Sequence, residues 1–155
     1  MGKKLTKIDA NRCAKGIETI IMKHPDALYG DCFPLEHKFA GGMYMRQITA
    51  PKGALMVGKT HRQSHPSFLL KGKVRVLTSE GIRTLTAPAS FVTKAGDKRA
   101  GLVIEEMVWV DVFKTKSRSI KTVERECVKA DAKAKITTKE IKLLTKISEN
   151  LQKEL

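Results

Sequence analysis

The sequence has few of the residues that several classes of protein need. Aromatic side chains make up 5% of its 155 residues, which is little for a surface that stacks single-stranded bases. The three cysteines, Cys13, Cys32 and Cys127, are an odd number and form no C-x-x-C pair, so we expect neither a disulfide framework nor a zinc knuckle. The chain also lacks a run of about 18 apolar residues, and its first ten residues are polar rather than signal-like. We therefore expect a soluble, unexported protein with reduced thiols and no membrane contact.

Several catalytic and nucleotide-binding motifs are also missing. The sequence contains no G-x-x-x-x-G-K-[ST] phosphate loop, no G-x-G-x-x-G and no G-x-S-x-G nucleophile turn. Cys13 and Cys127 lie in stripes with helical spacing, which favours packing over nucleophilic roles. Glu105 and Glu106 are adjacent on an expected strand, so their side chains should point to opposite faces and make a poor acid–base pair. These motifs and residues therefore give no support for a nucleotide-binding or nucleophilic enzyme.

Positive charge is the strongest feature of the composition. The formal net charge is +14, from 30 Lys and Arg against 16 Asp and Glu. Residues 1–36 contribute +1 (6 basic, 5 acidic), residues 37–115 contribute +8 (13 and 5), and residues 116–155 contribute +5 (11 and 6). A field of this sign attracts polyanions such as nucleic acid, or acidic ligands, and weakens with salt. An inert basic surface would have the same composition.

The chain begins with a helical pattern and continues with strands. Residues 6–24 place apolar side chains at three- to five-residue spacings, and Pro25 ends the expected helix. Residues 27–42 contain glycines and prolines and indicate a connecting segment with short extended pieces. From Met43 to Phe113, short runs rich in β-branched residues alternate with turn signals every 8–12 residues, as in a small sandwich or barrel. The expected runs are 43–49, 53–59, 67–78, 81–87, 89–94 and 101–113.

The last forty residues return to a helical pattern. Ile120, Val123, Cys127 and Val128 would lie on one face of a first helix. A second helix is expected in residues 136–155, because Thr137 and Glu140 form a capping box and apolar residues follow at helical spacing. We divide the chain into an N-terminal helix with its connecting segment (1–36), a β-barrel (37–115) and a C-terminal helical extension (116–155).

The central segment resembles the cupins, a family of small β-barrels. The first cupin motif, G-x5-H-x-H-x3,4-E-x6-G, matches in spacing at Gly53, Lys59, His61, His65 and Gly72, with a lysine for the first histidine and a histidine for the glutamate. The second motif keeps only its inner glycine, Gly96, and its histidine position holds Arg99. Residues 37–113 also resemble, in their sequence pattern, small cupin-like proteins of unknown function encoded by bacteriophages. The resemblance implies a mainly β double-stranded β-helix (jelly-roll) barrel, which usually forms dimers, and it implies no established reaction.

Three interpretations of the histidine stretch stay open. His61 and His65, with His37, Glu105 or Glu106 as a third ligand, could hold one divalent transition metal, but the cations at the other matched positions oppose this. Alternatively, Lys59, His61 and Arg99, with Arg46 as a further candidate, line a pocket for an anion. In the third interpretation, both histidines are hydrogen-bonded residues of the barrel.

These patterns lead to three hypotheses for function. The favoured one is a phage-type accessory cupin domain with a non-catalytic role, which binds an anionic ligand or a macromolecular partner through a basic pocket and surface. The second is a metal-dependent isomerase or oxygenase that uses His61 and His65, as the wider family implies. The third is an oligomeric structural component of a phage particle. In each case we expect a homodimer or higher oligomer, in the cytoplasm of an infected host cell or associated with the virion.

Overall fold

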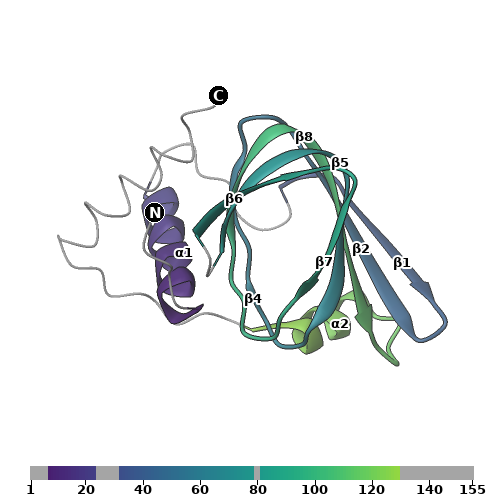
Figure 1. Cartoon of the computed structure of the whole chain (residues 1–155). Helices are drawn as coiled ribbons and strands as arrows, with labels where there is room; N and C mark the ends of the chain where they lie inside the picture. Colours follow the sequence, from purple (N-terminus) through teal and green to yellow (C-terminus); the bar gives the residue numbers. More distant parts are fainter. Residues whose placement is uncertain (1–6, 24–31, 79–80, 130–155) are drawn as a thin grey trace.

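The computed structural model describes residues 7–23, 32–78 and 81–129 (Figure 1). These residues form mainly antiparallel β-structure with two helices. In chain order the elements are α1 (Lys7–Met22), β1 (Leu35–Ala40), β2 (Met43–Ala50), β3 (Leu55–Val57), β4 (Thr60–His61), β5 (His65–Thr78), β6 (Gly81–Thr86), β7 (Ala89–Thr93), β8 (Ala100–Lys114), α2 (Ile120–Cys127) and β9 (Val128–Lys129). None of the described helices is long and apolar enough to cross a bilayer.

Two long strands, β5 and β8, organise the barrel. The first half of β5 pairs with β7, and its second half pairs with β6. The first half of β8 pairs with β3, and its second half pairs with β2, which in turn pairs with β1. Because β5 and β8 also pair with each other, they carry the chain from one layer to the other, and the layers enclose an interior (Figure 1). The mainly β barrel with an N-terminal helix, as predicted from the sequence, is confirmed.

The layers meet at a bend where the ladder of β5 and β8 shifts register. The irregularities lie between Leu69 and Val74. Gly72 has a φ of +87°, and a Cβ there would collide with the backbone carbonyl of Glu106, so this position requires glycine. Glu105 and Glu106 are both exposed beside the bend, where they pair with Lys73 and Lys71. Neither glutamate faces the barrel interior.

The barrel interior is filled mostly by small and branched side chains. Below the bend the buried cluster consists of Ala50, Leu69, Val74, Val76, Val103 and Met107, with Trp109 packed at its edge. A small barrel can be filled in this way, so that the interior is a packed core rather than a channel. The buried polar side chains of His65, Ser67, Thr93 and Asp111 lie outside this apolar cluster.

Helix α1 covers the outer face of the layer that contains β3 and β6. Ala14 and Ile17 pack against Leu77, Leu102 and neighbouring apolar residues. Polar contacts fix the helix at a second place: Asn11 donates to the carbonyl of Gly96 at 2.6 Å and accepts from the backbone N–H of Lys98 at 3.0 Å. The buried Lys98 ammonium lies 3.0 Å from Glu18 of the same helix. The helix predicted for residues 6–24 is thus confirmed as α1.

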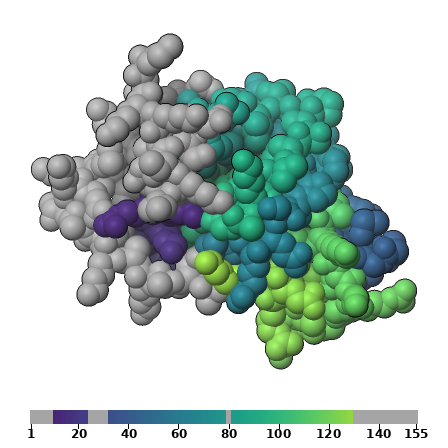
Figure 2. Space-filling view, turned by 60° about the horizontal axis from the view of Figure 1, so that its bottom comes forward, coloured from purple at the N-terminus to yellow at the C-terminus, as the bar shows by residue number. Residues whose placement is uncertain are grey.

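The segment α2–β9 closes one end of the barrel. Ser119 caps α2, and Val123 and Cys127 of this helix pack under Tyr44 and Phe113. Burial raises the pKa of the Cys127 thiol to about 11, which fits the predicted packing role. Strand β9 then pairs with β4. Figure 2, turned toward this end, shows α2 in light green beside the β1–β2 hairpin in blue.

Residues 35–40, predicted to lie in a connecting segment with short extended pieces, form strand β1. One detail of the predicted elements was wrong. Val128 does not continue the helical face of Ile120, Val123 and Cys127, because the helix ends at Cys127 and Val128 pairs with His61 in extended conformation. Val128 and Lys129 form backbone hydrogen bonds with the edge of β4, and the spacing of apolar residues along the sequence does not reveal this pairing. The predicted C-terminal helix, residues 136–155, lies outside the described residues.

Candidate functional site

The two histidines of the predicted motif lie side by side at the closed end of the barrel. Their ring centroids are 4.7 Å apart, and both rings pack against Phe113. His61 is held through its backbone, which accepts from Gly96 and donates to Asp97 while β4 pairs with β9 on its other side. His65 begins β5 and is 4% exposed. The motif in the sequence therefore identified two residues that are neighbours in the structure.

Asp111 is the polar centre of this end of the barrel. Its Oδ1 accepts from His65 Nε2 at 3.1 Å, from Ser67 Oγ at 2.6 Å and from Trp109 Nε1 at 3.1 Å. Burial alone would raise the pKa of Asp111, but the hydrogen bonds from His65 and Ser67 and the nearby imidazoles lower it below its usual value. The carboxylate is therefore ionised inside the barrel, with donors on one oxygen.

A chain of donors extends from Asp111 to Arg99. Because Ser67 gives its proton to Asp111, the 2.6 Å contact between Ser67 and Thr93 is donated by Thr93. Arg99 Nη1 in turn donates to Thr93 Oγ1 at 3.0 Å, and its guanidinium lies 5.0 Å from the centre of the Phe91 ring. Burial lowers the pKa of Arg99, whereas Asp97 and Asp111 act in the opposite direction. This series of hydrogen bonds thus connects the guanidinium of Arg99 with the carboxylate of Asp111.

The two imidazoles differ in their hydrogen bonds. His65 faces acceptors on both sides, the carbonyl of Gln63 at Nδ1 (3.1 Å) and Asp111 at Nε2. Both ring nitrogens of His65 thus lie within hydrogen-bond distance of an acceptor. The Nδ1 of His61 is buried and has no hydrogen-bond partner among the described residues. Burial lowers the pKa of His61 to about 4, so this ring is neutral at pH 7.

The donor set does not fit the metal that the cupin resemblance implies. The part of the chain that the structure describes contains no group of three or more His, Cys, Asp or Glu side chains placed to hold an ion. His65 uses both nitrogens in hydrogen bonds, which leaves the His61 imidazole as the available nitrogen donor of the pair. A single neutral imidazole is too few ligands for zinc, which takes three or four from the protein.

The remaining predicted residues lie in different places. Lys59 is exposed in the link between β3 and β4 and is not part of the polar cluster. Arg46 lies opposite Asp111 in the β2–β8 register, so both side chains belong to the interior face. His37 is on β1, where its Nδ1 lies 2.7 Å from the hydroxyl of Tyr44 and its ring stacks on the same side chain. Of the predicted ligand-binding set, His61 and Arg99 are thus drawn into one cluster and Lys59 is not.

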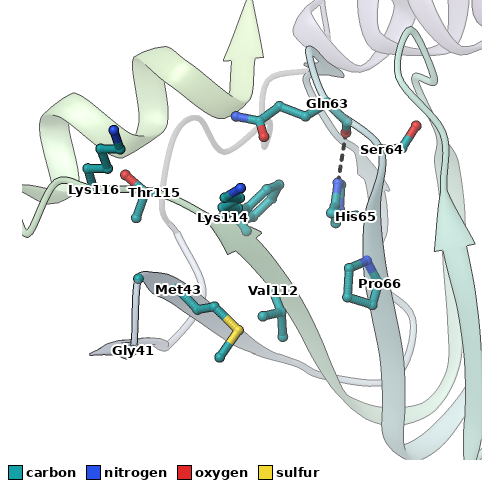
Figure 3. A pocket seen from close by; sticks show the side chains of 12 residues that line it. Gly41, Met43, Gln63, Ser64, His65, Pro66, Val112, Lys114, Thr115 and Lys116 are labelled. Carbon is teal, nitrogen blue, oxygen red and sulfur yellow. Dashed lines mark hydrogen bonds between the residues drawn. The ribbon is translucent and has the colours of Figure 1, made fainter.

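A pocket of about 760 Å³ opens beside His65 where β5 and β8 separate. Their ladder ends at the pair Ser67 and Asp111, although β5 continues to pair with β7 as far as His65 and β8 with β2 as far as Lys114. Figure 3 shows the side chains around this opening. They are Gly41, Gly42, Met43, Gln63, Ser64, His65, Pro66, Val112, Phe113, Lys114, Thr115 and Lys116.

The pocket combines apolar walls with positive charge. Met43, Pro66, Val112 and Phe113 supply the apolar surface, whereas Lys114 and Lys116 supply two ammonium groups. No Asp or Glu is among the lining residues. The inner wall reaches His65, which connects the pocket to the Asp111 cluster. This arrangement can hold a small molecule with an apolar body and an anionic group.

Sequence reasoning did not find Ser67, Thr93, Asp111 or the two pocket lysines. Alternation along a strand could have placed Ser67 on the face of His65, and it places Asp111 on the face of Trp109 and Phe113. It could not show that these faces meet, because that depends on the register of β5 and β8.

Comparisons with known proteins support the fold only. No family model matches the chain, and no curated protein matches it. One similar solved structure is KdgF from Halomonas sp., with a TM-score of 0.48 and 13% identity over 63% of this chain and 91% of that chain. Another is an acetylacetone dioxygenase from Acinetobacter johnsonii, with a TM-score of 0.47 and 20% identity over 59% of this chain and 65% of that chain. A third is the cupin_2 domain of an XRE family transcriptional regulator from Enterobacter cloacae, with a TM-score of 0.46 and 12% identity over 55% of this chain and 98% of that chain. All three TM-scores are below 0.5, and these likenesses assign no activity to this chain.

Proposed function

We propose that this protein is a non-catalytic binding domain for a small ligand with an apolar body and an anionic head group. The pocket beside His65 carries the proposal, because two lysines and four apolar side chains line it without a single carboxylate. An anion entering this pocket meets no like charge on its walls. The head group would lie near Lys114 and Lys116, and the body against Met43, Pro66 and Val112.

The closed hydrogen-bond network supports binding rather than catalysis. Ser67 directs its proton to Asp111 and not to an imidazole, so it is not arranged as an activated nucleophile. His65 is engaged at both nitrogens, and Asp111 is surrounded by donors. Groups held in this way stabilise a rigid wall, which favours a preformed binding site.

The proposal differs from the prediction in the cations that it uses. The sequence pointed to Lys59 and Arg99, but Lys59 is exposed elsewhere and Arg99 is already bound to Thr93 and lies 3.8 Å from Asp97. Lys114 and Lys116 line the pocket directly. A role in a phage, a nucleic-acid partner and a metal-dependent reaction stay predictions from the sequence.

Octanoate is a suitable probe, because it combines an eight-carbon chain with a carboxylate. Isothermal titration of the full chain with octanoate should give saturable binding, and octan-1-ol, which lacks the charge, should bind more weakly. The variant Lys114→Met/Lys116→Met should weaken octanoate binding about 2- to 30-fold, since each of the two exposed charge pairs contributes about 0.2–1 kcal/mol. It should leave the binding of octan-1-ol nearly unchanged.

The control is Lys52→Met/Lys94→Met, which removes the same charge from two exposed positions outside the pocket. It should bind octanoate like the unmodified chain. Equal loss in both double variants would mean that only the overall field attracts the anion, and it would contradict a specific site. Absence of octanoate binding, or equal affinity for octanoate and octan-1-ol, would also contradict the proposal.

A further inference from the structure

Glu126, in the last turn of α2, contacts two residues that line the pocket. Its Oε2 accepts from Thr115 Oγ1 at 2.8 Å, and its backbone carbonyl accepts from Gln63 Nε2 at 3.4 Å. Thr115 follows β8 and Gln63 lies between β4 and β5, so α2 contacts both segments at this rim. Figure 3 shows Thr115 and Lys116 on the side of the opening where α2 runs. The Glu126 carboxylate is therefore held beside the pocket, although Glu126 is not one of its lining residues.

The position of this carboxylate is fixed by buried contacts. Thr115 is 6% exposed, and its hydroxyl donates to Glu126 while it accepts from the backbone N–H of Ser117 at 3.0 Å. The next residue of α2, Cys127, is buried, and its carbonyl accepts from the backbone N–H of Arg62 at 2.7 Å. The backbone that carries Glu126 is thus anchored, and the Thr115 hydroxyl sets the direction of the Glu126 side chain.

Two ammonium groups and one carboxylate lie around the same stretch of chain. Lys114 and Lys116 precede and follow Thr115, whose hydroxyl binds Glu126. All three charged residues are exposed, and their formal charges sum to +1. The positive potential that a ligand head group meets here is therefore weaker than two lysines alone would produce.

Two electrostatic terms select the charge of the head group. The attraction grows in proportion to the head-group charge, whereas the cost of removing that charge from water grows with its square. A strongly positive site therefore favours a dianion, and a weakly positive site favours a monoanion. The Glu126 carboxylate cancels one of the two lysine charges and moves the pocket toward the second case. It also occupies the Thr115 hydroxyl, a donor that a phosphate oxygen would otherwise use.

We propose that Glu126 determines the specificity of the pocket and makes it favour a head group with one negative charge over a head group with two. The inference rests on the proposed function, because it concerns the head group of the same ligand. It narrows the ligand class to amphiphilic monoanions, such as carboxylates and sulfate monoesters, and phosphate monoesters are bound less tightly.

Octyl sulfate and octyl phosphate test the inference as a matched pair. Both have a tetrahedral head group on the same eight-carbon chain, and at pH 8 they carry one and about two negative charges. Isothermal titration of the full chain should give tighter binding of octyl sulfate. In Glu126→Gln, which keeps an amide oxygen for Thr115, octyl sulfate should bind about 1.5- to 5-fold more tightly. Octyl phosphate should gain about 2- to 25-fold, because the repulsion that is removed acts on twice the charge.

Glu105→Gln is the matched control. It removes the same charge from an exposed ion pair at the bend, about 30 Å from Lys114 along β8. It should leave both affinities unchanged. Three outcomes would overturn the role of Glu126: equal gains for the two ligands in Glu126→Gln, equal effects of the two variants, or tighter binding of octyl phosphate by the unmodified chain. With octanoate bound, these outcomes leave the proposed function intact, whereas absence of octanoate binding would contradict the proposed function and this inference with it.

Discussion

His65 Nε2 lies 3.1 Å from Asp111 Oδ1, and both side chains are buried at the closed end of the barrel. The pair joins the first residue of β5 to β8 beside the last paired residues, Ser67 and Asp111, where the two strands separate and the pocket opens. Ser67 and Trp109 donate to the same carboxylate oxygen. The wall of the proposed binding site is therefore built on a buried hydrogen bond between an imidazole and a carboxylate.

Removal of the Asp111 carboxylate should strongly destabilise the fold. Asp111→Ala leaves the donors on His65, Ser67 and Trp109 without their acceptor, and each unsatisfied buried donor costs about 1–3 kcal/mol. Urea unfolding measures this loss. The control is Glu105→Ala, which breaks the exposed pair with Lys73 and should cost at most about 1 kcal/mol. Similar losses in the two variants would contradict the importance of the buried contact.

Stability should fall as the pH decreases from about 6.5 to 4. The pKa of His61 is lowered from 6.5 to about 4 in the fold, chiefly by burial, so in this window the unfolded chain binds a proton that the folded chain does not. The loss approaches about 3 kcal/mol near pH 4 at most. The Asp111 pKa is also lowered, so its contribution is lost only as the pH falls below about 3.8.

The variant His61→Gln isolates the first of these effects. It lacks the titrating ring, so its free energy of unfolding should change less between pH 7 and pH 4.5 than that of the unmodified chain. Urea unfolding at both pH values gives this change in the free energy of unfolding for the variant and for the unmodified chain. Identical differences in the variant and the unmodified chain would show that His61 does not titrate with the lowered pKa.

Gly72 should not tolerate alanine. Gly72→Ala forces a side chain into positive φ and against the carbonyl of Glu106, whereas Gly53 has a φ of +88° with no atom within 4 Å of a Cβ. Gly53→Ala should cost about 1–2 kcal/mol from φ alone. The collision at Gly72 should add about 1–3 kcal/mol to that. Equal unfolding free energies of the two variants would show that the close approach of β5 and β8 does not constrain this position.

The described donor set also predicts that purified protein retains no stoichiometric transition metal. His65 is engaged at both nitrogens, and His61 has one buried nitrogen without a partner. Elemental analysis of tag-free protein should find much less than one ion per chain. One ion per chain, absent from a His61→Ala variant, would show that His65 leaves Asp111 to bind metal and would restore the enzyme hypothesis.

Local patterns predicted much of the fold and part of the site. The turn signals between residues 43 and 113 gave the strands of the barrel, and the spacing of His61 and His65 gave their proximity. Asp111 could not be assigned to them, because it is 46 residues from His65 and the contact depends on strand register. The pocket could not be predicted for the same reason, since it arises where the β5–β8 ladder ends at Ser67.

The measurement that tests the central claim most directly is chemical-shift mapping of the isotope-labelled chain during titration with octanoate. Binding in the pocket predicts saturable changes at the backbone amides of Gln63, Thr115 and Lys116 and none at Lys52 or Lys94. Changes that are absent, or that spread over lysines in all parts of the described surface, would contradict a specific anion-binding pocket beside His65.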